Sequence, residues 1–257
     1  MAEHVAVVMP AYNEAEGISG FIREILGALE PLADELSVHV ADDRSTDDTA
    51  EAARGTDRRV DVTTQPQNRG HGPTAVAAYR LGLASGADIV VHVDGDGQFG
   101  GEDIARVLEA VRATGSAAVH GVRHGRSDPW YRRILSSSLR VWSRLLAAHA
   151  VPDVNTPLRA YRREPLVDLL DALPPHPLVP HVHMSILEAR WGMAVRYVAV
   201  RSLPRRGVSQ TGTMWGARVR PLSLPPRSLV RFVGRAIAEV RAARRHRTPS
   251  ARTRSGT

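Results

Sequence analysis

The sequence contains no cysteine and no lysine among its 257 residues, and both absences limit its chemistry. Without cysteine, disulfide bonds and thiolate metal sites are excluded. Without lysine, the phosphate-binding Walker loop cannot be completed. All 34 basic residues are arginine, which genomic base composition explains without any functional cause. Even so, an anion site in this chain must use arginine, histidine, backbone N–H groups or a metal ion.

Long hydrophobic runs are also absent. No uninterrupted apolar stretch reaches the roughly 18 residues that a membrane span requires. The opening stretch MAEHVAVVMP has no basic segment ahead of its apolar residues, so no signal peptide is expected. We therefore expect a cytoplasmic location, either free or peripheral at the inner face of the membrane.

The net charge of +7 is unevenly distributed. Residues 218–257 contain eleven arginines and one glutamate, so this tail carries +10 and residues 1–217 carry −3. Residues 228–244 place apolar side chains on one helical face with arginines around them, which is typical of helices on anionic membranes. The same pattern fits a helix packed on the preceding domain, and the end of the tail is expected to be disordered. Nucleic-acid binding is not expected, because the tail has few aromatic residues and no recognised module.

Short buried-strand patterns alternate with helical patterns in the first half of the chain. Strands are expected at residues 5–9, 36–41, 60–64, 89–93 and 117–122. Helices are expected between them, at residues 16–29, 46–54, 73–84 and 102–113. This alternation predicts an α/β protein with a mostly parallel central sheet flanked by helices.

The pattern changes after about residue 125. Further helices are expected at residues 134–149, 164–173 and 184–191, and a strand at residues 194–202. A proline-stiffened loop is expected at residues 173–180. We therefore predict one domain over residues 1–217, with halves of about 1–125 and 126–217, followed by the basic tail.

Polar clusters follow the expected strands of the first half. They are PAYNE (10–14), DDRS (42–45), NRGHG (68–72), DGD (94–96) and RHGR (123–126). In open α/β sheets, ligands bind at the carboxyl ends of the strands. Five such clusters on one edge indicate a binding site.

The DGDGQ stretch is the strongest candidate for a metal site. Asp94 and Asp96 are two residues apart, so in extended backbone both carboxylates face the same side. They can converge on Mg²⁺ or Mn²⁺, with an amide oxygen added by Gln98. The alternative is a turn in which Asp and Gly serve only backbone geometry. A calcium EF-hand is excluded, because its sixth position is Phe99 and its twelfth is Ala105.

Other phosphate-binding devices are poorly supported. No GxGxxG motif joins the first strand to its helix, so a dinucleotide-binding Rossmann domain is not indicated. The NRGHG loop could wrap an anion with backbone N–H groups, but a lone glycine-rich loop is weak evidence. A metal ion combined with arginine is the better-supported phosphate site.

The motifs VVMPAYNEAEGI, VADDRSTDDT, NRGHGPTAVAAYRLGL, VVHVDGDGQFGGED, HGVR and DVNTPLRAYRRE occur in a characteristic order. In this order and spacing, residues 4–210 resemble family 2 glycosyltransferases, and most of all the polyprenyl-phosphate (dolichol-phosphate) mannosyltransferases and glucosyltransferases. The resemblance implies a GT-A fold with a Rossmann-like sheet, a GDP- or UDP-sugar donor, a divalent cation at a DxD motif and inverting transfer. It also implies a nucleotide-sugar half (about 1–125) and an acceptor half (126–217).

The resemblance assigns roles residue by residue on the donor side. The residues expected around the nucleotide and its diphosphate are Pro10, Tyr12, Glu14, Asp42, Asp94 and Gly95. Asp42 is expected to accept a hydrogen bond from the base. Asp96 and Gln98, with Asp94, are expected to ligate the metal that bridges the donor phosphates. Arg206, in RRGVSQ, is expected to close over the diphosphate.

On the acceptor side, Arg123 and Arg133 (or Arg132) are expected to hold an acceptor phosphate, and the alternative for each arginine is a solvated surface charge. Three departures from the family pattern fall in this half. Pro157 replaces a flexible glycine, Gln210 replaces a basic residue, and a histidine pair stands near the position of an acidic residue. His181 or His183 could act as a general base or a phosphate donor, or could simply be packed.

The expected chemistry depends on the acceptor. Departure of the nucleotide diphosphate leaves negative charge, which a metal ion and arginine stabilise. A phosphate acceptor is already ionised, whereas a hydroxyl acceptor needs a base. The leading hypothesis is transfer of a hexose, such as mannose or glucose, to a polyprenyl phosphate. The alternatives are a soluble hydroxyl acceptor (a secondary metabolite or glycan) and a noncatalytic protein that binds nucleotide sugars or nucleic acid.

Overall fold

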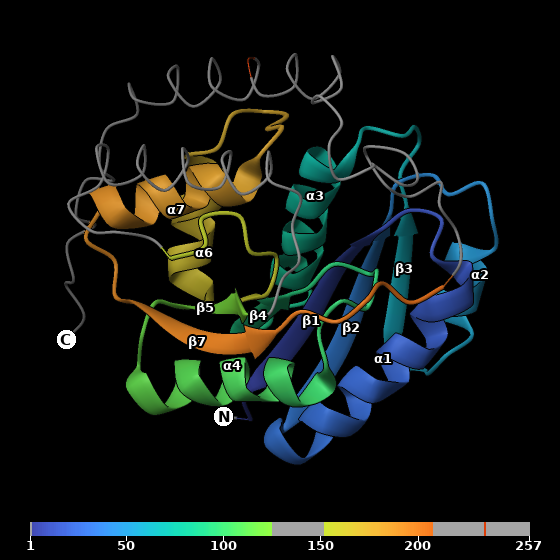
Figure 1. Cartoon of the computed structure of the whole chain (residues 1–257), viewed down its shortest axis with the longest axis horizontal. Coiled ribbons are helices and arrows are strands. Elements are labelled where there is room, and N and C mark those ends of the chain that lie inside the picture. The colour runs from blue at the N-terminus through green and yellow to red at the C-terminus, as the bar shows by residue number, and fades with distance from the viewer. Residues whose placement is uncertain (1, 125–151, 208–233, 235–257) are drawn as a thin grey trace.

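The computed structural model describes residues 2–124 and 152–207, together with Gly234. These residues form a sheet of seven strands in the order β3-β2-β1-β4-β6-β5-β7, with helices on both faces (Figure 1). The strands are β1 (His4–Ala11), β2 (Glu35–Asp42), β3 (Val60–Thr64), β4 (Ile89–His92), β5 (Ala118–His124), β6 (Arg159–Arg162) and β7 (Val195–Arg201). The helices are α1 (Ala15–Leu29), α2 (Thr49–Arg54), α3 (His71–Ala84), α4 (Gly101–Thr114), α6 (Arg163–Asp171) and α7 (Pro180–Arg190), with a 3₁₀ turn, η1 (Glu30–Leu32), after α1.

Both faces of the sheet are buried at its central strands, as their apolar sequences require. Along β1, Val5 and Val7 belong to the core shared with α1, α2 and α4. Their neighbours Ala6 and Val8 belong to the core shared with α3, α6 and α7. Figure 1 shows these two groups of helices on opposite sides of the sheet. Burial of each such valine contributes roughly 1.5–3 kcal/mol relative to its exposure, so a continuous apolar run favours a central strand.

The strand directions bring five loops to one edge. β1 is parallel to β2 and β4, β2 is parallel to β3, and β5 is parallel to β7. β6 runs antiparallel between β4 and β5, which leaves β5 parallel to β4. The carboxyl ends of β1 to β5 therefore lie at the same edge of the sheet. The predicted α/β class and its five first strands are confirmed.

Two features differ from the sequence pattern. The pattern misses β6, because its four residues RAYR carry an arginine at each end and have no apolar run. It also begins the helix after the proline-rich loop at Met184, whereas α7 begins at Pro180. Proline is well suited to the first turn of a helix, since its missing N–H has no partner there in any case. The predicted helices at 134–149 and 228–244 and the domain boundary at 217 lie outside the described residues, except for Gly234.

Candidate functional site

The turn that follows β4 is held against the end of β1. The backbone N–H of Gly95 donates to the carbonyl of Pro10 at 3.1 Å, and a Cβ on this glycine would lie 3.1 Å from the same oxygen. Oδ1 of Asp96 accepts a hydrogen bond from the backbone N–H of Gln98 at 3.1 Å, which closes the turn. The side-chain amide of Gln98 donates to the carbonyl of Leu203 at 3.4 Å. The turn is therefore shaped by its neighbours, and the metal-ligand role of Gln98 stays a prediction.

Three carboxylates gather at this turn: those of Glu14, Asp94 and Asp96. Burial, followed by the charge of Asp94, raises the pKa of Asp96 to about 7. Burial raises the pKa of Glu14 to about 7 as well, opposed by Arg205 and reinforced by the two aspartates. Oδ1 of Asp94 is buried and accepts no hydrogen bond from the described residues, and Nε2 of His71 lies 3.7 Å from it. Negative charge is therefore concentrated here without full compensation.

Asp94 and Asp96 fit a hard divalent cation in an open site. Mg²⁺ is commonly bound by one or two carboxylates and completes its shell with water and substrate phosphates. Among the described residues, no group of three or more His, Asp or Glu side chains is arranged to hold a metal ion by itself. A cation held here would therefore need further ligands from a bound molecule, such as a diphosphate.

Two adjacent arginines approach the turn and point in different directions. Arg205 forms an ion pair with Glu14, in which its Nε lies 3.2 Å from Oε2. Arg206 instead pairs with Glu24 on α1, and its guanidinium carbon lies 5.1 Å from the centre of the Phe21 ring. The sequence pattern assigns the diphosphate to Arg206, but the carboxylate cluster is contacted by Arg205. Sequence reasoning missed Arg205, because only the partners Glu14 and Glu24 show which of the two adjacent arginines reaches the cluster.

Two aspartates at the end of β2 accept hydrogen bonds from backbone N–H groups that could otherwise bind an anion. Asp42 is almost fully buried and accepts a hydrogen bond from the backbone N–H of Ser45 at 3.1 Å. Asp43 accepts hydrogen bonds from the backbone N–H groups of Arg69 and Gly70, at 2.8 and 2.9 Å. The second and third N–H groups of the NRGHG loop therefore bind a carboxylate of the protein itself. Asp43 organises this loop instead of leaving those groups for a phosphate.

Asn13 connects the loops after β1 and β2. Its backbone has a positive φ of 55°, and its Oδ1 accepts a hydrogen bond from the backbone N–H of Thr46 at 2.8 Å. The neighbouring Glu14 N–H donates to Oγ1 of Thr49 at 2.7 Å. The expected nucleotide-pocket residues lie at the carboxyl ends of β1 and β2, on the loop after β1 and in the turn after β4. Their binding roles stay predictions, for Pro10, Tyr12, Glu14, Asp42, Asp94 and Gly95.

Arg123, at the carboxyl end of β5, is held by a carboxylate from the second half of the chain. Its Nε and Nη2 donate to the two oxygens of Asp153 at 2.8 and 3.1 Å. Burial works against the charge of Asp153, but the hydrogen bonds from Arg123 keep its pKa below the ordinary value. Arg123 thus lies at the sheet edge formed by the carboxyl ends of β1 to β5. Its Nη1 takes no part in the paired hydrogen bonds to Asp153. Arg132 and Arg133 lie outside the described residues.

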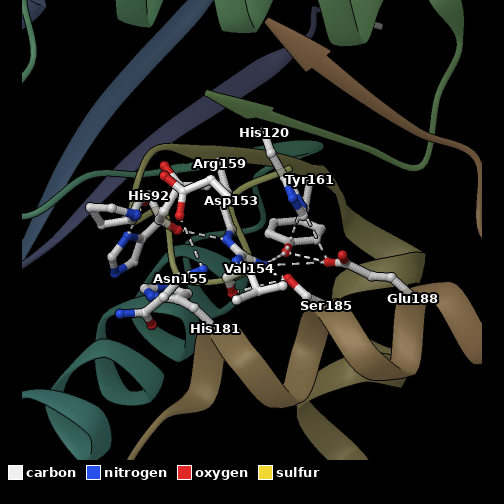
Figure 2. A network of polar contacts seen from close by, with 12 residues as sticks. His92, His120, Asp153, Val154, Asn155, Arg159, Tyr161, His181, Ser185 and Glu188 are labelled. Atoms are coloured by element: carbon white, nitrogen blue, oxygen red, sulfur yellow. Dashed lines mark hydrogen bonds and ion pairs between the residues drawn. The ribbon is translucent and has the colours of Figure 1, made fainter. Parts of the chain in front are cut away.

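A buried polar network supports the loop that carries Asp153 (Figure 2). Arg159 is fully buried and donates to the carbonyls of Val154 and Thr156, at 3.0 and 2.8 Å. Its other donors reach Ser185 on α7 and the Tyr161 hydroxyl. A buried charge this well satisfied fixes the surrounding backbone. The loop between residues 152 and 158 is therefore anchored to α7 and not merely packed on it.

The two histidines proposed as a base or phosphate donor are enclosed in α7. His181 and His183 are each only 2% exposed. Nε2 of His181 lies 3.2 Å from the Tyr79 hydroxyl, and its ring packs against His92. Burial and the neighbouring His92 hold the pKa of His181 well below its ordinary value, so this ring is neutral at physiological pH. The geometry of His181 favours the packed alternative, and the role of His183 stays a prediction.

The sheet, its helices and the acidic turn at the carboxyl edge define a GT-A glycosyltransferase fold. The chain belongs to the family described as "Glycosyl transferase family 2", whose model matches residues 6–170. The expected family and fold are thereby confirmed.

Named relatives lie among enzymes of polyprenyl phosphates. The chain is 31% identical over 211 residues to an undecaprenyl-phosphate mannosyltransferase of Micrococcus luteus, covering 78% of this chain and 84% of the relative. It is 32% identical over 173 residues to a polyprenol monophosphomannose synthase of Mycolicibacterium smegmatis, covering 64% of this chain and 63% of the relative. It spans about half of the undecaprenyl-phosphate 4-deoxy-4-formamido-L-arabinose transferases that it also matches.

Solved structures share the fold at lower sequence identity. Mannosyl-3-phosphoglycerate synthase of Rubrobacter xylanophilus matches with a TM-score of 0.66 and 19% identity, over 100% of this chain and 79% of that one. A mannosyltransferase of Pyrobaculum calidifontis, solved with GDP-Man and Mn²⁺, matches with a TM-score of 0.58 and 20% identity, over 97% of this chain and 66% of that one.

Proposed function

We propose that this protein transfers a hexose, mannose or glucose, from a GDP- or UDP-sugar to a polyprenyl phosphate, with inversion and with Mg²⁺ or Mn²⁺ as cofactor. The observation that carries the proposal is the cluster of Glu14, Asp94 and Asp96 beside Arg205, with raised carboxyl pKa values that call for a cation. The 31% identity to an undecaprenyl-phosphate mannosyltransferase over 78% of the chain supports the acceptor class.

The donor side of the proposed reaction uses the turn after β4. Asp94 and Asp96, with Gln98, would hold the divalent cation, which when bound supplies positive charge to the donor diphosphate. Arg205 lies beside the same carboxylates and would face the departing diphosphate. Charge fixed in advance at the point where negative charge develops stabilises the transition state more than the ground state.

The acceptor side of the proposed reaction uses Arg123. A polyprenyl phosphate arrives ionised, so its oxygen needs no general base. Arg123, held by Asp153, would donate from its remaining N–H groups to that phosphate. His181 is enclosed, and its lowered pKa makes it a weak base, which supports this acceptor over a hydroxyl that would need an accessible base.

The decisive experiment is a transfer assay with the full chain. Labelled GDP-mannose, GDP-glucose, UDP-glucose and UDP-mannose would be tested with Mn²⁺ or Mg²⁺ and a short-chain polyprenyl phosphate. We expect label to enter the organic phase with one donor and to depend on the cation. A labelled water-soluble product formed from small-molecule extracts, with none in the lipid phase, would refute the acceptor assignment and favour a soluble hydroxyl acceptor.

A membrane contact through the basic tail is a further part of the proposal. None of the helices described is long and apolar enough to cross a bilayer. We propose that residues 218–257 hold the protein at the inner face of the membrane, where anionic lipids attract arginine by roughly 1 kcal/mol per residue near the surface. Deletion of residues 226–257 is expected to reduce cosedimentation with vesicles containing anionic lipid. Unchanged cosedimentation would refute this contact.

A further inference from the structure

Residues 203–206 cross the turn after β4 and are bonded to it on both sides of Gly97. The backbone N–H of Leu203 donates to the carbonyl of Gln98 at 2.9 Å. The backbone N–H of Arg206 donates to the carbonyl of Asp96 at 3.0 Å. We call residues 203–206 the strap. Since the turn carries the acidic residues of the site, the strap fixes the backbone on which they depend.

Arg206 passes through a gap that only glycines leave open. A Cβ on Gly97 would lie 2.5 Å from Cδ of Arg206, and one on Gly17 of α1 would lie 2.8 Å from its Cβ. Gly97 also has a φ of +68°, which disfavours a side chain at that position. The side chain of Arg206 therefore lies between α1 and the turn and is only partly exposed to solvent.

Glu24 on α1 receives Arg206 and a second donor at the same time. One carboxylate oxygen accepts from Nη2 of Arg206. The other accepts from the backbone N–H of Gly101, at the start of α4, at 2.7 Å. Gly101 follows the turn by three residues, so Glu24 secures both the strap and the segment that leaves the turn.

The two adjacent arginines of the strap reach different partners. In the strap these neighbours face opposite sides, Arg206 toward Glu24 and Arg205 toward Glu14. We propose that Glu24 and Arg206 are positioning residues, whose ion pair holds the strap on the turn and keeps Arg205 aimed at the donor diphosphate. We call this ion pair and its hold on the strap the clasp. The identity of the ligand rests on the proposed function, but the clasp can be tested without it.

The test uses Glu24→Gln in the full chain. Glutamine keeps a carbonyl oxygen for Gly101 N–H and removes the charge that pairs with Arg206. The matched control is Glu30→Gln. Glu30 lies in η1, directly after α1, and forms an ion pair with Arg59 at 3.0 Å. Arg206→Gln removes the same pair from the other partner, so the proposal does not depend on the folding of one variant.

Hydrogen exchange of peptides that cover residues 203–206 gives the first measurement. We expect Glu24→Gln and Arg206→Gln to accelerate exchange of the Leu203 and Arg206 amides, and Glu30→Gln to leave it unchanged. The double variant should be no faster than Arg206→Gln alone, because Glu24→Gln removes an ion pair that Arg206→Gln has already removed. Unchanged exchange in both single variants would overturn the clasp.

Calorimetric titration with GDP and with UDP, each in the presence of Mn²⁺, gives the second measurement. We expect about three- to tenfold weaker binding of the preferred nucleotide in both single variants, the size of a partly exposed ion pair plus a cation–π contact. In the transfer assay the donor KM should rise while the acceptor KM stays constant. Faster exchange with unchanged nucleotide affinity would show that the ion pair of Glu24 and Arg206 only stabilises the structure, and would overturn the positioning role. Failure of the wild type to bind any nucleotide would refute the proposed function, while the exchange result would still decide the clasp.

Discussion

Arg205 and Glu14 form an ion pair, although 191 residues separate them in the chain. Glu14 stands at the start of α1, beside Asp96, and is more than nine-tenths buried. The pair therefore joins the segment after β7 to the loop after β1. It also places a permanent cation against carboxylates whose charge it only partly offsets.

Arg205→Gln is expected to reduce kcat by about a hundredfold, because a fixed donor aimed at developing negative charge has this order of effect. Steady-state kinetics with saturating donor and acceptor would measure it. Arg59→Gln serves as the control, since Arg59 pairs with Asp57 and Glu30 away from the turn. A kcat within twofold of the wild type would show that Arg205 has no part in the chemical step.

Asp96→Asn is expected to weaken Mn²⁺ binding and to lower transfer by about a thousandfold, since a metal contributes several kcal/mol of charge stabilisation. Asparagine keeps the oxygen that accepts the Gln98 N–H, so the turn is retained. Mn²⁺ affinity would be followed by electron paramagnetic resonance, with the exposed Asp61→Asn as control. Full activity at saturating Mn²⁺ would remove Asp96 from the metal site.

Periodicity predicts the first half of this fold well because its strands are buried on both faces. Such strands read as continuous apolar runs, and the parallel connection places their loops on one edge. β6 is missed for the converse reason: its stability comes from pairing with β4 and β5 and from burial of Arg159, neither of which leaves a local pattern. The antiparallel strand β6 therefore depends on tertiary contacts and cannot be predicted from its local sequence.

The candidate site shows the same division. Asp94 and Asp96 are two residues apart in the sequence, so their spacing alone predicts that they act together. Arg205 and Arg206 are adjacent, but only the distant Glu14 and Glu24 decide which of them faces the site. Likewise, the fork between Arg123 and Asp153 depends on a loop fixed by the buried Arg159.

Arg123→Gln is expected to raise the KM for polyprenyl phosphate by about tenfold or more, because a charge-assisted hydrogen bond contributes about 1.5–3 kcal/mol. The affinity for nucleotide and Mn²⁺ should not change, since Arg123 is paired with Asp153 and not with the turn after β4. The exposed Arg80→Gln on α3 is the matched control. An acceptor KM equal to that of the wild type, or a parallel loss of nucleotide affinity, would contradict this role.

His92 provides a prediction for stability against pH. Its ring is fully buried on β4, and Nδ1 lies 2.7 Å from the carbonyl of Pro157. Burial lowers the pKa of His92 to about 4 from an ordinary value of 6.5. In the unfolded chain the His92 ring is therefore protonated below about pH 6.5, whereas in the folded protein it is protonated only below about pH 4. Stability from this group is complete above pH 6.5 and is lost as the pH falls toward 4.

His92→Asn removes the titrating ring while its amide can still donate to the carbonyl of Pro157. Between pH 7 and pH 5 the free energy of unfolding should fall by about 2 kcal/mol less in this variant than in the wild type, whatever the difference between them at pH 7. Urea unfolding at both pH values measures the two differences. The exposed His176→Asn should keep the wild-type dependence. If His92→Asn also kept the wild-type pH dependence of unfolding, His92 would be charged in the folded protein at pH 5. The stacked ring of Tyr79 would then have to accommodate that charge.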